Sequence, residues 1–320
     1  MEITTKTQYR KIQAIPQLKP FGKYLLPCRG ISGWAMKFMT PESLKMWDAN
    51  LIADGFRYLA GTAEKNRVFY PVYDEEAARK DPALREQAIF FFPAARGSRC
   101  VFLCAGGGYS MACNLIETFP VARKVNERGY HAVAVNYRTG KNALCPNPIE
   151  DLARAVLYVT AHARELGADM SGYYVMGFSA GGHLVSNYAI EENGYGAFGA
   201  QKPSGIVLSY PVTDLGEYGH GTTREQFLGK GHLRDRTLID RYSSHRHLTK
   251  DYPPTFLWLF DRDDTVDPMN SQLFAESAEK AGMPCCFESY PGTLHGASLG
   301  TGTACEGWFD RAFDFLESER

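Results

Sequence analysis

The segment Tyr173–Leu184, which reads YYVMGFSAGGHL, constrains the fold of this chain more than any other stretch. An apolar run leads into the pentapeptide GFSAG at residues 177–181, and a helix-compatible pattern follows at once. This order is typical of a G-x-S-x-G nucleophile elbow, in which a buried strand turns sharply into a helix and exposes a serine hydroxyl. We therefore expect Ser179 to have an uncommon backbone conformation at the start of a helix, where free N–H groups favour developing negative charge.

The two glycines that flank Ser179 have a steric reason to be there. Side chains at Gly177 and Gly181 are expected to collide with the turn or with the neighbouring strand. The alternative is a turn rich in glycine and serine that matches the motif by chance. The strand before the pentapeptide and the helix after it favour the elbow.

Apolar runs alternate with helix-compatible segments through most of the chain. Besides the run before Ser179, strands are expected at 68–73, 88–92, 100–104, 131–137, 205–210, 255–260 and 285–290. Besides the helix after Ser179, helices are expected at 119–128, from 147 to about 167, at 270–281 and at 307–318. Short apolar strands that alternate with helices predict a mostly parallel sheet covered by helices on both faces.

The N-terminal part of the chain departs from this alternation. Residues 1–65 carry scattered prolines, glycines and aromatic residues, and we expect them to form an arm packed on a single domain made of residues 66–320. Within the arm, Pro41 is expected in the first turn of a helix. Its aromatic residues are expected to pack on the main domain, and the alternative is that Trp34 or Trp47 covers the active site.

A second departure lies at residues 212–250, which are rich in glycine, histidine and arginine and lack the strand–helix rhythm. We expect an inserted lid there. Its four histidines are expected in solvent, with substrate contact as the alternative; they are His220, His232, His245 and His247. His183 lies four residues after Ser179 on the same expected helix, so we interpret it as a packing or hydrogen-bonding residue.

The composition limits the class of protein. A chain of 320 residues, 44% hydrophobic and 22% charged, is large enough for one extensive core and suits a soluble globular enzyme. Its formal net charge of −1 argues against nucleic acid or an anionic membrane as a general partner. No apolar stretch is long enough to span a bilayer, and residues 1–20 lack the apolar core of a signal peptide. The eight scattered cysteines suggest reduced thiols and a cytoplasmic location, whereas the oligomeric state is left open.

A serine hydroxyl becomes a good nucleophile only when a base takes its proton and a third group orients that base. In a sheet of this kind, such groups follow the carboxyl ends of strands, in the chain order serine, acid, histidine. His295 follows the expected strand at 285–290 and precedes Gly296, which makes it the predicted base among eight histidines. Four aspartates lie within residues 261–267, after the strand at 255–260, and the residues alone leave open which one faces the imidazole.

A third part of the chemistry is predicted at the glycine run 106–108, which follows the expected strand at 100–104. Hydrolysis of an acyl bond builds negative charge on the carbonyl oxygen, and preorganised N–H groups stabilise that charge. Because glycines let the backbone come close, we expect the N–H groups of Gly107 and Gly108 to point at this oxygen. The N–H of Ala180 is the expected third donor.

Neither a metal site nor a phosphate loop is expected. The aspartates at 261–267 lack the glycine and the distal glutamate of a calcium loop, and the cysteines lack zinc-site spacing. The glycine run 106–108 lacks the G-K-[ST] ending of a P-loop and does not fit G-x-G-x-x-G.

Several of these motifs occur together in one known superfamily. GFSAGGHL at 177–184, the preceding glycine run, VNYR at 135–138 and DDTVDP at 263–268 resemble the α/β-hydrolase superfamily. Within it, they are most similar to the acetyl-esterase and hormone-sensitive-lipase-like carboxylesterases. The resemblance covers about residues 66–320 and implies a central, mostly parallel eight-stranded sheet flanked by helices, and no cofactor.

The resemblance also selects the acid. In this family the acid lies three residues before the valine of a D-x-x-V-P loop, so Val266 selects Asp263, with Asp264 in reserve. Two residues depart from the family pattern. Asp267 stands where the loop's first proline usually lies, and Ala105 replaces the histidine that often precedes the glycines. The second departure raises the question of what braces the oxyanion loop.

These residues together predict a serine esterase. Ser179 attacks a carboxylic ester, His295 moves the proton, and Asp263 orients the imidazole. Residues adjacent to these groups are expected to line the acyl pocket, with core packing as the alternative; they are Tyr109, Phe178 and Val266. The resemblance implies a short acyl group such as acetyl. The alcohol is left open between a sugar, a xylan fragment and another small molecule, so an acetylated sugar is one candidate substrate.

Two other interpretations stay open. An amidase such as an aryl formamidase, or a small peptidase, would use the same three residues, and a panel of esters and amides separates them. A non-catalytic relative that binds a ligand is the second. Such relatives usually lose one of the three residues, and all three candidates are present in this chain.

Overall fold

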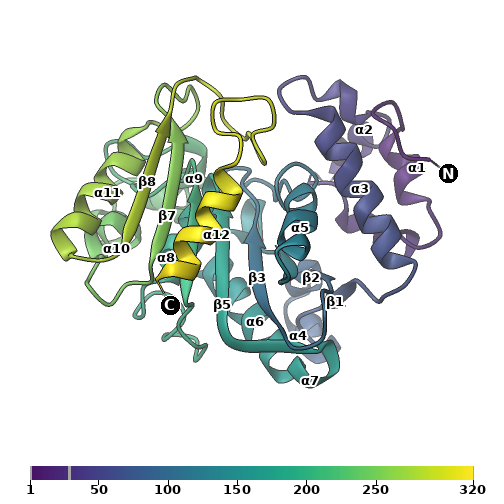
Figure 1. The fold of residues 1–320 in the computed structure, drawn as a ribbon, viewed down its shortest axis with the longest axis horizontal. Helices are drawn as coiled ribbons and strands as arrows, with labels where there is room; N and C mark the ends of the chain where they lie inside the picture. The colour runs from purple at the N-terminus through teal and green to yellow at the C-terminus, as the bar shows by residue number, and fades with distance from the viewer. Residues whose placement is uncertain (1, 28–29, 320) are drawn as a thin grey trace.

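A single sheet organises the molecule (Figure 1). The computed structural model describes residues 2–27 and 30–319, and eight strands among them form a sheet of order β1-β2-β4-β3-β5-β6-β7-β8. The strands are β1 (Phe69–Pro71), β2 (Ala88–Phe92), β3 (Ser98–Cys104), β4 (His131–Asn136), β5 (Ala168–Phe178), β6 (Gly205–Ser209), β7 (Thr255–Phe260) and β8 (Cys285–Tyr290). Strand β2 runs antiparallel to β1 and β4, and all other pairs are parallel. The expected mostly parallel eight-stranded sheet is confirmed.

Helices cover both faces of this sheet. One face carries α5 (Thr118–Glu127) and α12 (Trp308–Ser318), and both lie in front of the sheet in Figure 1. The other face carries α6 (Asn147–Ala161), the short α7 (Ala163–Leu166), α8 (Ala180–Tyr188) and α11 (Met269–Ala281). Because both faces are covered, the central strands are buried along nearly their whole length, which explains why their sequences read as continuous apolar runs.

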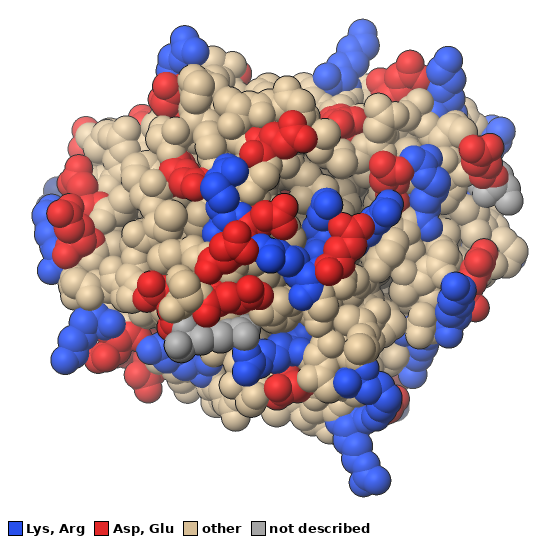
Figure 2. Space-filling view, viewed as in Figure 1, with Lys and Arg blue, Asp and Glu red and all other residues tan. Residues whose placement is uncertain are grey.

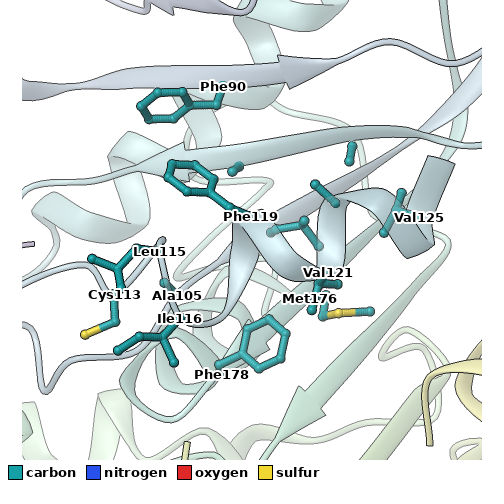
Figure 3. Close-up of a cluster of buried hydrophobic side chains, with 14 of the residues drawn as sticks. Phe90, Ala105, Cys113, Leu115, Ile116, Phe119, Val121, Val125, Met176 and Phe178 are labelled. Atoms are coloured by element: carbon teal, nitrogen blue, oxygen red, sulfur yellow. The ribbon is translucent and has the colours of Figure 1, made fainter. Parts of the chain in front are cut away.

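The core beneath α5 shows how the two layers hold together (Figure 3). The side chain of Phe119 on α5 meets Phe90 of β2 edge-on, with ring centroids 5.0 Å apart. Met176 and Phe178 of β5 lie under the same helix in this cluster. Each such large side chain stabilises the fold by about 1.5–3 kcal/mol when fully buried. The packing holds β5, and with it the turn that follows β5, in one place.

The N-terminal residues are helical. They form α1 (Tyr9–Gln13), a 3-10 segment (Lys19–Tyr24), α2 (Gly30–Met36), a 3-10 turn (Pro41–Ser43) and α3 (Ala49–Ala63). Helix α3 packs on α5, where Gly55 lies so close that an added Cβ would be 2.9 Å from the Pro120 nitrogen. The division of the chain into an arm and a main domain stays a prediction.

The structure corrects the length of the helix expected from Pro41. The helical turn there ends at Ser43, because Leu44 leaves helical geometry with φ −90° and ψ 69°. The long helix begins only at Ala49, where the Asp48 side chain accepts hydrogen bonds from the next free amides. Proline favoured a first turn as predicted, but nothing beyond Ser43 continued it.

The remaining short helices lie in three connections. Between β1 and β2 are α4 (Glu75–Lys80) and a 3-10 turn (Pro82–Glu86), and a further turn lies at Gly140–Asn142. Residues 212–250 form α9 (Gly221–Leu228), α10 (Arg236–Tyr242) and 3-10 turns at Lys230–His232 and Ser244–His247. This segment is tied to α11, because the Asn270 side chain accepts from the amides of Thr213 and Asp214 at 2.9 Å. Its role as a lid stays a prediction.

The surface carries charges of both signs. On the face seen in Figure 2, basic and acidic side chains alternate, in keeping with a formal net charge of −1. Arg128 at the end of α5 pairs with Asp310 and Asp314 of α12, which links two helices on the same face of the sheet. Within residues 2–27 and 30–319, every helix is too short or too polar to cross a membrane.

Candidate active site

The turn between β5 and α8 has the geometry expected of a nucleophile elbow. Ser179 has φ 53° and ψ −120°, a conformation that a residue with a side chain rarely adopts. An added Cβ on Gly177 would lie 2.3 Å from the Gly181 carbonyl oxygen, and one on Gly181 would lie 2.2 Å from the Cys104 oxygen of β3. The predicted steric reason for both glycines is therefore confirmed.

Three residues from separate loops meet at this turn. The Oγ of Ser179 is 2.8 Å from Nε2 of His295, whose Nδ1 is 2.7 Å from Oδ2 of Asp263. The other carboxylate oxygen accepts from the amides of Thr265 at 2.9 Å and Val266 at 3.0 Å. The Asp263 side chain is only 1% exposed, so its pairing with the imidazole is little screened by solvent. With Nδ1–H directed at the carboxylate, Nε2 is left to accept the serine proton.

The structure separates the two candidate acids. Asp263 contacts His295, whereas the neighbouring Asp264 is exposed and bonds to the Thr265 hydroxyl at 3.0 Å. The carboxylate of Asp263 turns inward because the two amides that follow it hold its first oxygen. Among the residues that the structure describes, no group of three or more His, Cys, Asp or Glu side chains is placed to hold a metal ion.

The glycine run lies directly beside the serine. An added Cβ on Gly106 would be 2.7 Å from the Cβ of Ser179. Gly107 and Gly108 have φ of 122° and 59°, which favour glycine, and both line the cavity next to the hydroxyl. Within the described residues, no acceptor is hydrogen-bonded to the amide of Gly107 or Gly108. Ala180 is the first residue of α8, where a helix leaves its amides free.

Two side chains brace this loop. Tyr137 donates its hydroxyl to the Ala105 carbonyl at 2.5 Å, and the Gly106 amide donates to Oε2 of Glu117 at 2.5 Å. Tyr137 was visible as part of the VNYR motif, whereas Glu117 was not singled out in the sequence analysis. Its one signal is a charged residue within an apolar stretch, ACNLIETF.

Ser179, His295 and the glycines at 107 and 108 line a cavity of about 290 Å³. Its apolar wall consists of Met46, Trp47, Met111, Cys113 and Ile116. Its polar wall includes Ser110, His220, Thr222 and Thr265. Of the two tryptophans considered from the sequence, Trp47 lines this cavity, and its indole nitrogen would lie 2.6 Å from a Cβ on Gly296. Trp34 instead lines a separate hollow with Gln13 and Lys37.

The structure also corrects the three residues expected to line the acyl pocket, because all three lie in the core. Tyr109 is fully buried and stacks on Phe227 with ring centroids 5.0 Å apart. Phe178 packs edge-on against Trp308, and Val266 is 3% exposed in the core on the other face of the sheet. Adjacency to Ser179 or Asp263 misled the prediction, because neighbouring residues on a strand or tight turn point their side chains in different directions.

The histidines divide in a way that the sequence did not predict in full. His183 is buried, with Nδ1 2.9 Å from the Tyr109 hydroxyl and Nε2 2.9 Å from the Tyr242 carbonyl, in keeping with its expected structural role. Burial lowers its pKa from 6.5 to about 4. His220 was expected in solvent, and this is wrong. It caps α9, lines the cavity, and has a pKa lowered by burial and then by His295.

Comparison with known proteins shows which family this chain is similar to. Residues 90–278 match the family model described as BD-FAE. That segment contains Ser179 and Asp263 but ends before His295, and Trp47 precedes it. Among solved structures, an acetyl ester-xyloside bifunctional hydrolase from Caldicellulosiruptor lactoaceticus has a TM-score of 0.67 and 30% identity, covering 77% of this chain and 96% of that one.

Two curated relatives are similar over part of their length. The chain is 29% identical over 228 residues to an acetylxylan esterase from Xylanibacter ruminicola, covering 68% of this chain and 45% of that protein. It is also 29% identical over 230 residues to endo-1,4-beta-xylanase B from Butyrivibrio fibrisolvens, covering 69% of this chain and 36% of that protein. The chain therefore spans less than half the length of these two relatives.

Proposed function

The chain belongs to the BD-FAE family within the α/β-hydrolase superfamily, and from this premise we propose that it is a serine carboxylesterase for short-chain acyl esters, acetyl esters above all. One observation carries the proposal. The hydroxyl of Ser179, the imidazole of His295 and the carboxylate of Asp263 form a continuous hydrogen-bonded chain that ends in a cavity. Such a series of hydrogen bonds activates a serine for attack on a carbonyl carbon.

The reaction follows from these contacts. Ser179 Oγ attacks the ester carbonyl while His295 Nε2 takes the hydroxyl proton, and Asp263 stabilises the imidazolium that forms. The carbonyl oxygen becomes an oxyanion, which the amides of Gly107, Gly108 and Ala180 are proposed to bind. As the intermediate collapses, the C–O bond to the alcohol breaks and the imidazolium returns its proton to that oxygen. Water, deprotonated by the same imidazole, then releases the acid and restores the serine.

The cavity supports a small substrate. A volume of about 290 Å³ suits a short acyl group together with a compact alcohol. The substrate is proposed to be an acetylated sugar, whose alcohol part is the sugar, since two of the similar proteins are named as an acetylxylan esterase and an acetyl ester-xyloside bifunctional hydrolase. Trp47 offers an aromatic face and His220 a polar group to such an alcohol. The expected cytoplasmic location stays a prediction.

The first test measures two reactions. One is the hydrolysis of p-nitrophenyl esters from acetate to decanoate, and the other is the release of acetate from acetylated xylo-oligosaccharides. We expect the wild type to prefer acetate and Ser179→Ala to lose at least about 10⁴-fold in kcat. An anilide panel with matched acyl groups runs beside it. Faster hydrolysis of the anilides than of the esters would indicate an amidase. Wild-type protein that hydrolyses neither panel would contradict the proposal.

A matched pair tests the acid. Asp263→Asn should lose about 10⁴-fold in kcat, because the imidazole no longer has a carboxylate to hold its tautomer and charge. Asp264→Asn, one residue away and exposed, should stay within about twofold of the wild type, since it leaves these contacts intact. Equal losses in the two variants would remove Asp263 from the proposed role.

A further inference from the structure

Glu117 is a buried carboxyl group that the ester mechanism leaves without a role. It lies immediately before α5, is 3% exposed, and belongs to the wall of the cavity that holds Ser179. Burial raises its pKa from 4.5 to about 7, against the hydrogen bonds and the attraction of His295, which lower it. A carboxyl group is costly to bury, so its contacts deserve an explanation.

One contact fixes the oxyanion loop. The Ala105 carbonyl and the Gly106 amide belong to the same peptide group. Tyr137 holds the oxygen of that group at 2.5 Å, and Glu117 holds its nitrogen at 2.5 Å. A planar peptide held at both ends cannot rotate, and the next residue is Gly107. The carboxylate therefore sets the direction in which the following amides leave the strand.

The second contact reaches the histidine loop. The other oxygen of Glu117 accepts from the Tyr210 hydroxyl at 3.0 Å. That hydroxyl accepts in turn from the Ser298 amide at 3.3 Å, three residues after His295. The ring of Tyr210 also packs edge-on against the imidazole, with centroids 4.8 Å apart. One carboxyl group is thus connected to the loop after β3 and, through Tyr210, to the loop after β8.

We propose that Glu117 and Tyr210 form a brace that sets the oxyanion loop and the His295 loop relative to each other, which makes Glu117 a positioning residue for ester hydrolysis. The inference rests on the proposed function. A carboxylate only accepts hydrogen bonds, so it can receive the Gly106 amide and the Tyr210 hydroxyl together. A glutamine at position 117 keeps one acceptor oxygen and has a donor NH2 group in place of the other. It therefore cannot accept hydrogen bonds from the Gly106 amide and the Tyr210 hydroxyl through two oxygens.

The brace predicts which kinetic constant changes. Amides that point at the developing oxyanion act in the transition state, so their misalignment lowers kcat and leaves KM nearly unchanged. In Glu117→Gln we expect kcat for p-nitrophenyl acetate to fall about 10- to 100-fold, with KM within about threefold. The affinity for a trifluoromethyl ketone, whose adduct with Ser179 carries an oxyanion, should fall by the same factor as kcat.

Tyr210→Phe gives a second variant that removes a single oxygen atom. Its matched control is Tyr252→Phe, which loses a buried hydroxyl bonded to the Ser186 carbonyl, away from the site. The control should keep wild-type kcat, whereas Tyr210→Phe should lose kcat as Glu117→Gln does. Because the two residues act as a unit, the double variant should be no slower than the slower single variant.

Three results overturn the inference. They are an unchanged kcat in folded Glu117→Gln, a loss that appears in KM alone, and equal losses in Tyr210→Phe and its control. If Glu117→Gln fails to fold, the comparison of Tyr210→Phe with Tyr252→Phe decides alone. Wild-type protein that is inert on all esters contradicts the proposed function itself, so the two failures are distinguishable.

Discussion

Two glycine-rich turns lie side by side at the carboxyl ends of β3 and β5, and they are held in different ways. The elbow at 177–181 is determined by its own residues and the strand beside it, because added Cβ atoms on its glycines would lie 2.2–2.3 Å from backbone oxygens. The loop at 105–109, which is proposed to bind the oxyanion and is called the oxyanion loop, is held by side chains from elsewhere, Glu117 and Tyr137. Steric exclusion acts at both turns, since a Cβ on Gly107 would lie 2.4 Å from the Met111 carbonyl oxygen, but only the second turn is also held by hydrogen bonds from distant side chains.

This difference explains which turn a motif can identify. A turn that admits only glycine at given positions leaves the same short pattern wherever it occurs. A turn held by distant side chains tolerates another brace, so Ala105 can stand where related loops often carry histidine. The loop keeps its glycines, but the residues that hold it are invisible in its own sequence.

The largest expected effect comes from breaking the steric turn. In Gly181→Ala, the new Cβ would lie 2.2 Å from the Cys104 oxygen and 2.5 Å from the Ala105 oxygen. Because backbone must move, we expect esterase activity to fall at least about 10³-fold and the free energy of unfolding to fall by about 3 kcal/mol. Activity assays and urea unfolding measure the two effects.

The matched control is Gly61→Ala in α3, where an added Cβ meets nothing within 4 Å. Alanine at that helical position should stabilise the protein by about 0.5–1 kcal/mol and leave activity unchanged. If Gly181→Ala behaves like this control, the elbow is not sterically determined and the contrast with the oxyanion loop disappears.

The second prediction uses the buried groups near the two turns, which respond to pH in opposite directions. His183 in α8 has its pKa lowered to about 4 by burial, so the unfolded chain takes up its proton first on acidification. Its contribution to stability is complete above pH 6.5 and is lost as the pH falls toward 4. For Glu117, the pKa raised to about 7 means that the unfolded chain releases its proton first, so its contribution is complete below pH 4.5 and is lost as the pH rises through 7.

Each change corresponds to a free energy on the order of 3 kcal/mol. Urea unfolding of wild type, His183→Gln and Glu117→Gln from pH 4 to 8 measures it. Because the two pH ranges overlap, the variants differ in sign. Relative to the wild type, His183→Gln should remove a gain in stability between pH 4 and 6.5, and Glu117→Gln should remove a loss of stability between pH 4.5 and 7. Changes of the same sign in the two variants would contradict the assigned burial of one of these groups.

The smallest expected effect concerns the wall beside the oxyanion loop. Trp47→Ala removes an aromatic side chain that lines the cavity and packs against Gly296, next to the base. We expect kcat/KM for p-nitrophenyl acetate to fall about 10-fold while esters with longer acyl chains lose less, because the pocket becomes wider. Rates across the ester series measure this shift.

Trp34→Ala supplies the comparison, since Trp34 is 63% exposed and lies in a separate hollow. It should leave the whole series within about twofold of the wild type. The same shift in both variants would mean that the N-terminal residues act through general stability, and not through the wall of the cavity.

The sequence by itself predicted where the strands lie along the chain, the helices that follow Ser179 and the position of His295 after the last strand. These features depend on local patterns: the period of apolar residues, and turns that only glycine can make. The sheet then brings the carboxyl ends of β5, β7 and β8 to one edge, so three distant residues become neighbours in space.

The tertiary structure alone decided where side chains point and what they contact. Asp263 faces the imidazole because the amides of Thr265 and Val266 hold its carboxylate. The resemblance selected this residue among four neighbouring aspartates, but the contacts that orient it were not visible in the sequence. Tyr109 and Phe178 turned into the core, and Trp47 and His220 entered the cavity from segments far away in the chain. Secondary structure can be predicted from the period of apolar residues along the sequence. A cavity wall or a brace depends instead on packing between residues that no local pattern connects.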